Sequence, residues 1–215
     1  MTYEQKTYYA KIFCRVSHPL LIPIYSCIIG WLLFFSPVRM SNSILSEFAK
    51  GVSLSVYVIY PTILFLLPVV LVKAYRRYYK NVFPQQQIRQ MKAMPDIITL
   101  TCLVLGHLHQ KAVFLPYVIT CITLAAVIIF VLHILIRKWF DFSLHTAAWG
   151  GVAGALIAYS FILMMFNPVW WICFAFFMGG CVGSCRMFLG YHNLSEVVGG
   201  FAIGAVVAHL SVVIS

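Results

Sequence analysis

The sequence contains few charged residues and very few acidic ones. Only 9% of its 215 residues are charged, and Asp and Glu together account for five positions. Soluble globular domains carry about 25% charged residues, so this composition excludes an ordinary soluble domain. Hydrophobic residues make up 62% of the chain. For this length, the composition favours about six to eight membrane spans over one soluble domain.

The sequence also lacks a cysteine framework. Most of the seven cysteines lie inside apolar runs, where Cys behaves as a small hydrophobic residue. Cys181 and Cys185 are four residues apart, but no second pair with ligand spacing accompanies them. The cysteines therefore predict neither disulfides nor a metal site, and they do not indicate a redox compartment. Their positions are 14, 27, 102, 121, 173, 181 and 185.

A cleavable signal peptide is not expected, because the first apolar run lacks a small-x-small cleavage site followed by a soluble domain. We interpret that run as a first span. A transmembrane helix needs about 20 largely apolar residues. Seven runs are candidates: 19–36, 53–74, 95–109, 113–136, 143–166, 168–185 and 193–213. The prediction is an all-α protein, one integral membrane domain over residues 1–215 with six or seven transmembrane helices.

The uncertainty between six and seven comes from the short third run. Residues 95–109 could cross the membrane or form a re-entrant hairpin with the fourth run, connected tightly around residues 107–111. Glycine pairs at four-residue spacing occur in the last three runs, and such pairs let helix backbones approach closely. We therefore expect these three helices to form the tightly packed centre. The pairs are Gly150 and Gly154, Gly179 and Gly183, and Gly200 and Gly204.

Basic residues give the chain a formal net charge of +10. They cluster between apolar runs, which fits lipid headgroups and loop topology and gives no reason to expect nucleic acid. With seven spans, twelve basic residues fall on one side and three on the other, so the basic side is predicted to be cytoplasmic. The twelve are Lys6, Lys11, Arg15, Lys73, Arg76, Arg77, Lys80, Arg89, Lys92, Arg137, Lys138 and Arg186; the three are Arg39, Lys50 and Lys111.

The polar residues best suited to chemistry lie on this basic side, at the border of the last two runs. His192 and Glu196 are four residues apart and would share one face if the last helix begins there. A carboxylate in that position can hold an imidazole in one tautomer. Arg186 could bind a phosphate or carboxylate with its planar guanidinium. The alternative is that all three residues anchor helix ends at the membrane interface.

Two further groups occur on the same side. Ser143 is a plausible N-cap, and His145 would lie in the first helical turn, near free backbone N–H groups suited to an anion. Arg89 and Lys92 could add positive charge to the same pocket, or act only as positive-inside anchors. Histidines 107 and 109 are two residues apart and would not face one metal site on a helix.

The spacing Arg186-x5-His192-x3-Glu196, preceded by Ser184, resembles the third signature of the type 2 phosphatidic acid phosphatase superfamily. That signature reads Ser-Arg-x5-His-x3-Asp. The present chain departs from it in two ways: Cys185 separates the serine from the arginine, and Glu replaces Asp.

The two other signatures of that superfamily have weaker counterparts in the same order. Ser143-Leu144-His145 resembles Pro-Ser-Gly-His, without the proline and with Leu144 at the glycine. Arg89-x2-Lys92-x2-Pro95 loosely resembles Lys-x6-Arg-Pro. The resemblance covers residues 89–200, about half of the chain.

The resemblance implies a helical membrane phosphatase that hydrolyses a lipid phosphate or diphosphate without metal or other cofactor. His192 would form a phosphohistidine, Glu196 would orient it, and His145 would protonate the leaving group. The phosphate would be bound by Arg186, Lys92, Arg89 and Ser143. The partners implied are the lipid phosphate substrate and membrane lipids, and the expected location is the bacterial cytoplasmic membrane. The site is predicted on the cytoplasmic face from the distribution of basic residues, although many members of the superfamily have it on the opposite face.

Two other classes remain open. A catalytically inactive relative that binds phospholipid headgroups or a membrane partner is the main alternative, motivated by the departures from the signatures. A transporter or channel is disfavoured, because no predicted span carries a charged residue near its centre. The sequence names neither the particular lipid phosphate nor the oligomeric state.

Overall fold

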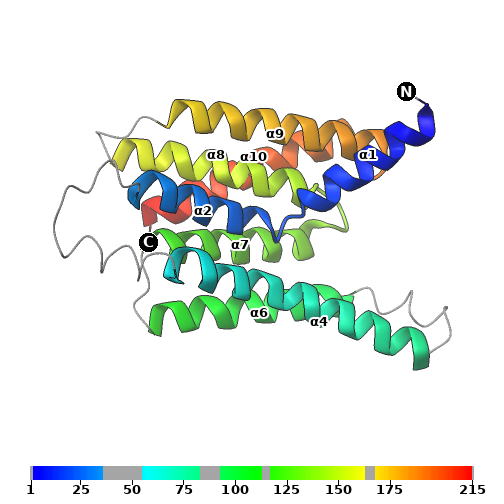
Figure 1. The fold of residues 1–215 in the computed structure, drawn as a ribbon, viewed down its shortest axis with the longest axis horizontal. Helices are drawn as coiled ribbons and strands as arrows, with labels where there is room; N and C mark the ends of the chain where they lie inside the picture. The colour runs from blue at the N-terminus through cyan, green and yellow to red at the C-terminus, as the bar shows by residue number, and fades with distance from the viewer. Residues whose placement is uncertain (1, 36–54, 83–92, 113–116, 163–167, 215) are drawn as a thin grey trace. The chain divides into compact units, whose positions relative to one another are not determined.

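A computed structural model describes residues 2–35, 55–82, 93–112, 117–162 and 168–214 (Figure 1). Within these ranges the chain is helical and contains no strand, which confirms the all-α prediction for the part described. The elements are α1 (Tyr3–Val16), α2 (Ile22–Phe35), the π-helical turn η1 (Ser55–Ile59), α4 (Tyr60–Val82), α6 (Ala93–Ala112), α7 (Tyr117–Ile136), α8 (Leu144–Ile162), α9 (Val169–Phe188) and α10 (Leu194–Ile214).

Each of the seven predicted runs contains a described helix. By length and composition, three of the helices are able to cross a membrane: α7, α9 and α10. The predicted tight connection around residues 107–111 is wrong, because α6 continues through these residues to Ala112. At this end of α6, His109 Nδ1 lies 2.8 Å from the Tyr60 hydroxyl of α4.

The helices group into two compact units. The first unit combines Met1–Pro23 with Leu124–Ser215, and the second comprises Ile24–Thr123. The first unit therefore holds α1, most of α7, and α8, α9 and α10, and it contains every candidate site residue except Arg89 and Lys92.

In the first unit, α8 and α10 pack with their backbones in close approach (Figure 1). A Cβ on Gly150 or Gly154 of α8 would overlap backbone atoms of α10. Conversely, a Cβ on Gly204 of α10 would overlap the backbone of Ala147 in α8. Glycine is thus required on both helices, as expected where small residues bring membrane helices together.

The third glycine pair packs against side chains. A Cβ on Gly179 of α9 would meet the Phe201 ring of α10, and one on Gly183 would meet Val197. Because α9 also packs against α8, the three helices form the tight centre that the glycine pairs predict.

One end of the first unit carries all of its Lys, Arg, Asp and Glu residues. At this end α7 finishes at Ile136, α8 begins at Leu144, α9 finishes at Phe188 and α10 begins at Leu194. The basic residues are Lys6, Lys11, Arg15, Arg137, Lys138 and Arg186, and the acidic ones are Glu4, Asp141 and Glu196. We call this end the charged end; the candidate site lies there.

The sequence interpretation missed α1, which contacts α9 at the charged end. A capping box starts the helix: the Thr2 hydroxyl accepts the Gln5 N–H, and the Gln5 side chain accepts the Thr2 N–H. Such a box satisfies two backbone donors that a helix start leaves free. Helix α1 ends at Val16, and the N–H of its C-cap residue, Ser17, donates to the Phe13 carbonyl.

Candidate functional site

The turn between α9 and α10 positions Arg186, Tyr191 and His192. Gly190 follows the C-cap of α9 and has a φ of 69°, a left-handed conformation that glycine adopts at little cost. The Gly190 N–H donates to the Met187 carbonyl at 2.9 Å, and the Tyr191 N–H donates to the Arg186 carbonyl at 3.0 Å. These two bonds make a Schellman motif, in which the residue after glycine packs back on the last helical turn.

In this motif the residue that packs back is Tyr191, and it contacts Arg186. The guanidinium carbon of Arg186 lies 4.5 Å from the centre of the Tyr191 ring, a distance suited to a cation–π interaction. The Arg186 guanidinium also contacts the Cys14 thiol of α1. Its Nε is buried without a hydrogen-bond partner among the described residues. The arginine is thus held from two sides with donor capacity left for an anion.

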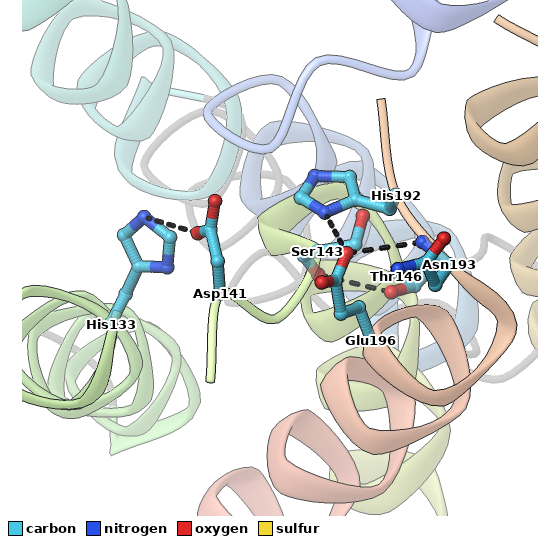
Figure 2. A network of polar contacts seen from close by, with 7 residues as sticks. All are labelled: His133, Asp141, Ser143, Thr146, His192, Asn193 and Glu196. Atoms are coloured by element: carbon cyan, nitrogen blue, oxygen red, sulfur yellow. Dashed lines mark hydrogen bonds and ion pairs between the residues drawn. The ribbon is translucent and has the colours of Figure 1, made fainter. Parts of the chain in front are cut away.

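His192 follows this turn and pairs with Glu196, as the four-residue spacing predicts. His192 Nδ1 lies 3.0 Å from Glu196 Oε2, and the two side chains are 10% and 24% exposed. Because a carboxylate only accepts, Nδ1 carries a proton and donates it, which leaves the Nε2 lone pair available in the neutral ring. The same Glu196 oxygen accepts the Asn193 N–H at 3.1 Å, so the start of α10 fixes the carboxylate. Figure 2 shows this arrangement.

Ser143 lies beside this pair, at the start of α8 (Figure 2). Its N–H donates to the Glu196 carbonyl at 3.1 Å, and its carbonyl accepts the Ala147 N–H, so Ser143 occupies the predicted N-cap position. However, the Ser143 side chain does not cap the helix. It is fully buried, and its hydroxyl makes no hydrogen bond to the described part of the protein. A buried hydroxyl normally has a partner, so this one is suited to a ligand.

The turn before α8 is anchored by buried apolar packing. Phe142 is fully buried and belongs to one cluster with Ile129 and Ala147. This packing fixes the chain on both sides of Ser143. Nearby, His133 Nε2 lies 3.9 Å from Asp141 Oδ1, a long ion pair on an exposed carboxylate that adds little stability.

His145, in the first turn of α8, reaches the same region. Its ring hydrogen-bonds the backbone of Cys14 and lies close enough to Arg186 and His192 for their charges to interact. The ring of His18 packs edge to face against it, with centroids 5.8 Å apart. Among the described candidates, the structure therefore brings together Arg186, His192, Glu196, Ser143 and His145.

Three residues of this cluster were missed by the sequence interpretation: Cys14, His18 and Tyr191. Cys14 and His18 come from the N-terminal segment, and no local spacing links them to α8 or α9. The pKa of the Cys14 thiol is raised, because burial outweighs the lowering effect of the neighbouring Arg186. Tyr191 lies between Arg186 and His192 in the sequence, and Gly190 before it is a local signal for its position, since a Schellman glycine fixes where the next residue packs.

Two predicted phosphate-binding residues, Arg89 and Lys92, lie outside the described residues. Ser184, the serine of the third signature, is exposed on α9 while Arg186 is partly buried. Residues two positions apart on a helix point about 200° away from each other. Because Cys185 separates them, Ser184 and Arg186 therefore point in nearly opposite directions.

The cluster is rich in groups that bind anions and poor in acids. The imidazoles of His18, His145 and His192 and the guanidinium of Arg186 lie near one another. Ser143 lies beside the His192–Glu196 pair, and the Glu196 carboxylate is engaged with His192 and Asn193. Within the described ranges, no group of three His, Cys, Asp or Glu side chains is arranged to hold a metal ion. The arrangement can bind an anion next to a histidine whose Nε2 is free to attack.

Comparison with known proteins gives no relative. No protein-family model matches the chain, and neither a curated protein nor a solved structure is significantly similar to it.

Proposed function

We propose that this protein is a membrane phosphatase that hydrolyses a lipid phosphate or diphosphate through a phosphohistidine on His192. The observation that carries the proposal is the His192–Glu196 pair beside a buried Ser143 hydroxyl that makes no hydrogen bond to the described residues. A serine or threonine hydroxyl, an arginine and a helix N-terminus are common ligands of phosphate. The proposal agrees with the signatures of the type 2 phosphatidic acid phosphatase superfamily that the sequence resembles.

In the proposed first step, Nε2 of His192 attacks phosphorus, the N–P bond forms, and the bond from phosphorus to the leaving oxygen breaks. Glu196 holds the Nδ1 proton and stabilises the positive charge that develops on the ring. We assign to His145 the proton that the leaving oxygen takes up. Burial and the charge of Arg186 favour the neutral ring, so in this proposal the negative charge of the bound phosphate stabilises the imidazolium. In the second step His145 takes a proton from water, whose oxygen attacks phosphorus, and the N–P bond breaks to release phosphate and free His192.

The phosphate oxygens need positive charge and donors in both steps. Arg186 and the Ser143 hydroxyl supply them from the described residues, and the first-turn N–H groups of α8 point to the same region. Lys92 and Arg89 are proposed to complete this set. The longer Glu196 side chain is compatible with its orienting role, since its oxygen lies 3.0 Å from Nδ1.

We propose six or seven spans in one membrane domain, adding other helices to the three that are long and apolar enough to cross. The site would then lie at the bilayer surface, where the charged end meets lipid headgroups. Because this end holds all six basic residues of the first unit, the positive-inside rule favours the cytoplasmic face, in a bacterial cytoplasmic membrane.

The test is release of inorganic phosphate by the detergent-purified chain from a panel of lipid phosphates, with EDTA present. We expect release by the natural chain and none by His192→Ala, with His209→Ala, inside α10, as the matched control. Acid-labile, base-stable phosphate on the protein after brief reaction would identify the phosphohistidine. Full turnover by folded His192→Ala would exclude this mechanism. Binding of anionic lipid without release from any lipid would instead favour the inactive relative.

A further inference from the structure

Helix α1 buries only a narrow face. Ala10, Cys14 and Ser17 are buried, and their spacing of four and then three residues places them on one side of the helix. This side contacts α9. The rest of the helix surface is exposed or only half-buried.

The opposite side carries an exposed apolar stripe. Tyr8, Ile12 and Val16 are spaced four residues apart and are 63%, 38% and 54% exposed, and Tyr9 lies next to them at 57%. An apolar stripe on one face of a helix is normally buried against something. Within the described residues of the first unit, these side chains stay largely exposed.

Basic residues border this stripe on both sides. By helical position, Lys11 and Arg15 lie between the stripe and the buried face on one side, and Lys6 lies on the other. All three are exposed, and the only acidic residue of the helix is Glu4. An apolar stripe flanked by Lys and Arg is typical of helices that lie in the interface of an anionic bilayer.

The contacts of α1 place it at the level of the headgroups. The Tyr3 ring lies 5.6 Å from the Phe188 ring, and the Cys14 thiol contacts Arg186. Phe188 and Arg186 form the last turn of α9, which is long and apolar enough to cross a membrane. The end of such a span lies at the boundary between the hydrocarbon and the headgroups. With 14 residues, α1 is itself too short to cross.

We propose that α1 is a surface helix bound to an anionic lipid leaflet, with Tyr8, Ile12 and Val16 inserted among the acyl chains. Lys6, Lys11 and Arg15 would contact lipid phosphates, and the buried face would remain on α9. Charge complementarity identifies the partner as anionic lipid, since three bases border the stripe and one acid lies on the helix. This binding does not depend on catalysis, so it can be tested whether or not the protein is a phosphatase.

The experiment places the full chain in lipid nanodiscs of phosphatidylcholine alone or mixed with phosphatidylglycerol. Hydrogen exchange of the α1 amides is followed by mass spectrometry, with α10 peptides as internal reference. We expect α1 amides to exchange about tenfold more slowly with the anionic lipid. Replacing Lys6, Lys11 and Arg15 by Gln should remove that lipid dependence, because each base near an anionic surface changes binding about fivefold.

Two further variants separate the stripe from the charge. Replacing Tyr8, Ile12 and Val16 by Ser should speed α1 exchange in both lipids, while the buried face and the α10 reference stay unchanged. The matched control replaces three bases of α4, Lys73, Arg76 and Arg77, by Gln and should leave α1 exchange as it is. Equal exchange in both lipids, unaffected by the Gln and Ser variants, would overturn the proposal. Slow exchange found only in discs that hold two copies would also overturn it, by assigning the stripe to a dimer.

Discussion

The two units of this protein place their histidines in different chemical settings. In the first unit, His192 is paired with a carboxylate at 3.0 Å. In the second, His107 lies 3.2 Å from the Thr123 hydroxyl and His109 lies 2.8 Å from the Tyr60 hydroxyl. A carboxylate both orients an imidazole and stabilises its cation, whereas a hydroxyl only satisfies a ring nitrogen. The same residue type is therefore a candidate for chemistry in one unit and a structural residue in the other.

The units also differ in how their helices approach each other. In the first unit, the glycines of α8 and α10 face backbone, so a methyl group cannot be added without moving a helix. In the second unit, Gly106 of α6 faces the flexible end of the Leu64 side chain of α4. Close backbone contact makes the first unit rigid where it bears the site, and rigid elements hold a site more accurately than adjustable ones.

The largest expected effect comes from removing the negative charge of Glu196, the carboxylate partner that the histidines of the second unit described above lack. Glu196→Gln keeps the size of the side chain and an acceptor for the Asn193 N–H but loses the carboxylate. We expect phosphate release to fall on the order of 10²–10⁴-fold, the usual contribution of a positioned acid or base. Glu196→Asp should recover part of the activity, and Thr123→Val, which alters the histidine setting of the second unit, should retain all of it. Full activity of folded Glu196→Gln in the lipid phosphate assay would contradict the role assigned to the pair.

The next effect concerns packing. Gly204→Ala forces the α8 and α10 backbones apart and should destabilise the protein by about 1–3 kcal/mol or more. Gly106→Ala should change stability by less than about 1 kcal/mol, because Leu64 can rotate away while alanine favours the helix. Gly180→Ala has open space around it and should stabilise by about 0.5–1 kcal/mol. Unfolding by denaturing detergent compares the three; equal losses at Gly204 and Gly106 would remove the distinction between the units.

A smaller effect is expected at His18, which packs against His145. His18→Ala removes the ring that orients His145 and should lower turnover about tenfold, equivalent to about 1.4 kcal/mol. His18→Phe keeps a ring for the edge-to-face contact and should recover most of this loss. The measurement is turnover at saturating lipid phosphate, with thermal unfolding as the control for folding. A His18→Phe variant as slow as His18→Ala would show that a ring nitrogen is needed.

Much of this could be predicted from the sequence because the determining signals are local. Apolar runs predicted a helix in each of seven places, and the four-residue spacing of His192 and Glu196 predicted their contact. The glycine pairs predicted which helices pack tightly. In each case, residues a few positions apart on one helix carry the information.

Other features depended on contacts that sequence spacing does not reveal. Cys14 and His18 join the site only because α1 folds onto α9. The short third apolar run predicted a tight connection at residues 107–111, yet these residues are helical. His107, His109 and Gln110 there contact side chains of α7 and α4. The start of α1 does have a local signal in the sequence, the capping box of Thr2 and Gln5.

The smallest expected effect tests whether the polar cluster of the second unit is only structural. The Thr123 hydroxyl donates to Gln110 Oε1 at 2.5 Å, while Gln110 Nε2 is buried without a partner in the described ranges. Gln110→Leu combined with Thr123→Val removes both sides of this bond and should change stability by less than about 1 kcal/mol, because no buried polar group of the pair is left behind. Gln110→Leu alone should be no better than the double variant, since it leaves the Thr123 hydroxyl with only His107 and two backbone carbonyls as partners. Denaturing-detergent titration measures both. If the double variant loses clearly more than about 1 kcal/mol of stability, or loses phosphate release, the cluster has a role beyond satisfying its own polar atoms. The contrast between the histidines of the two units would then fail.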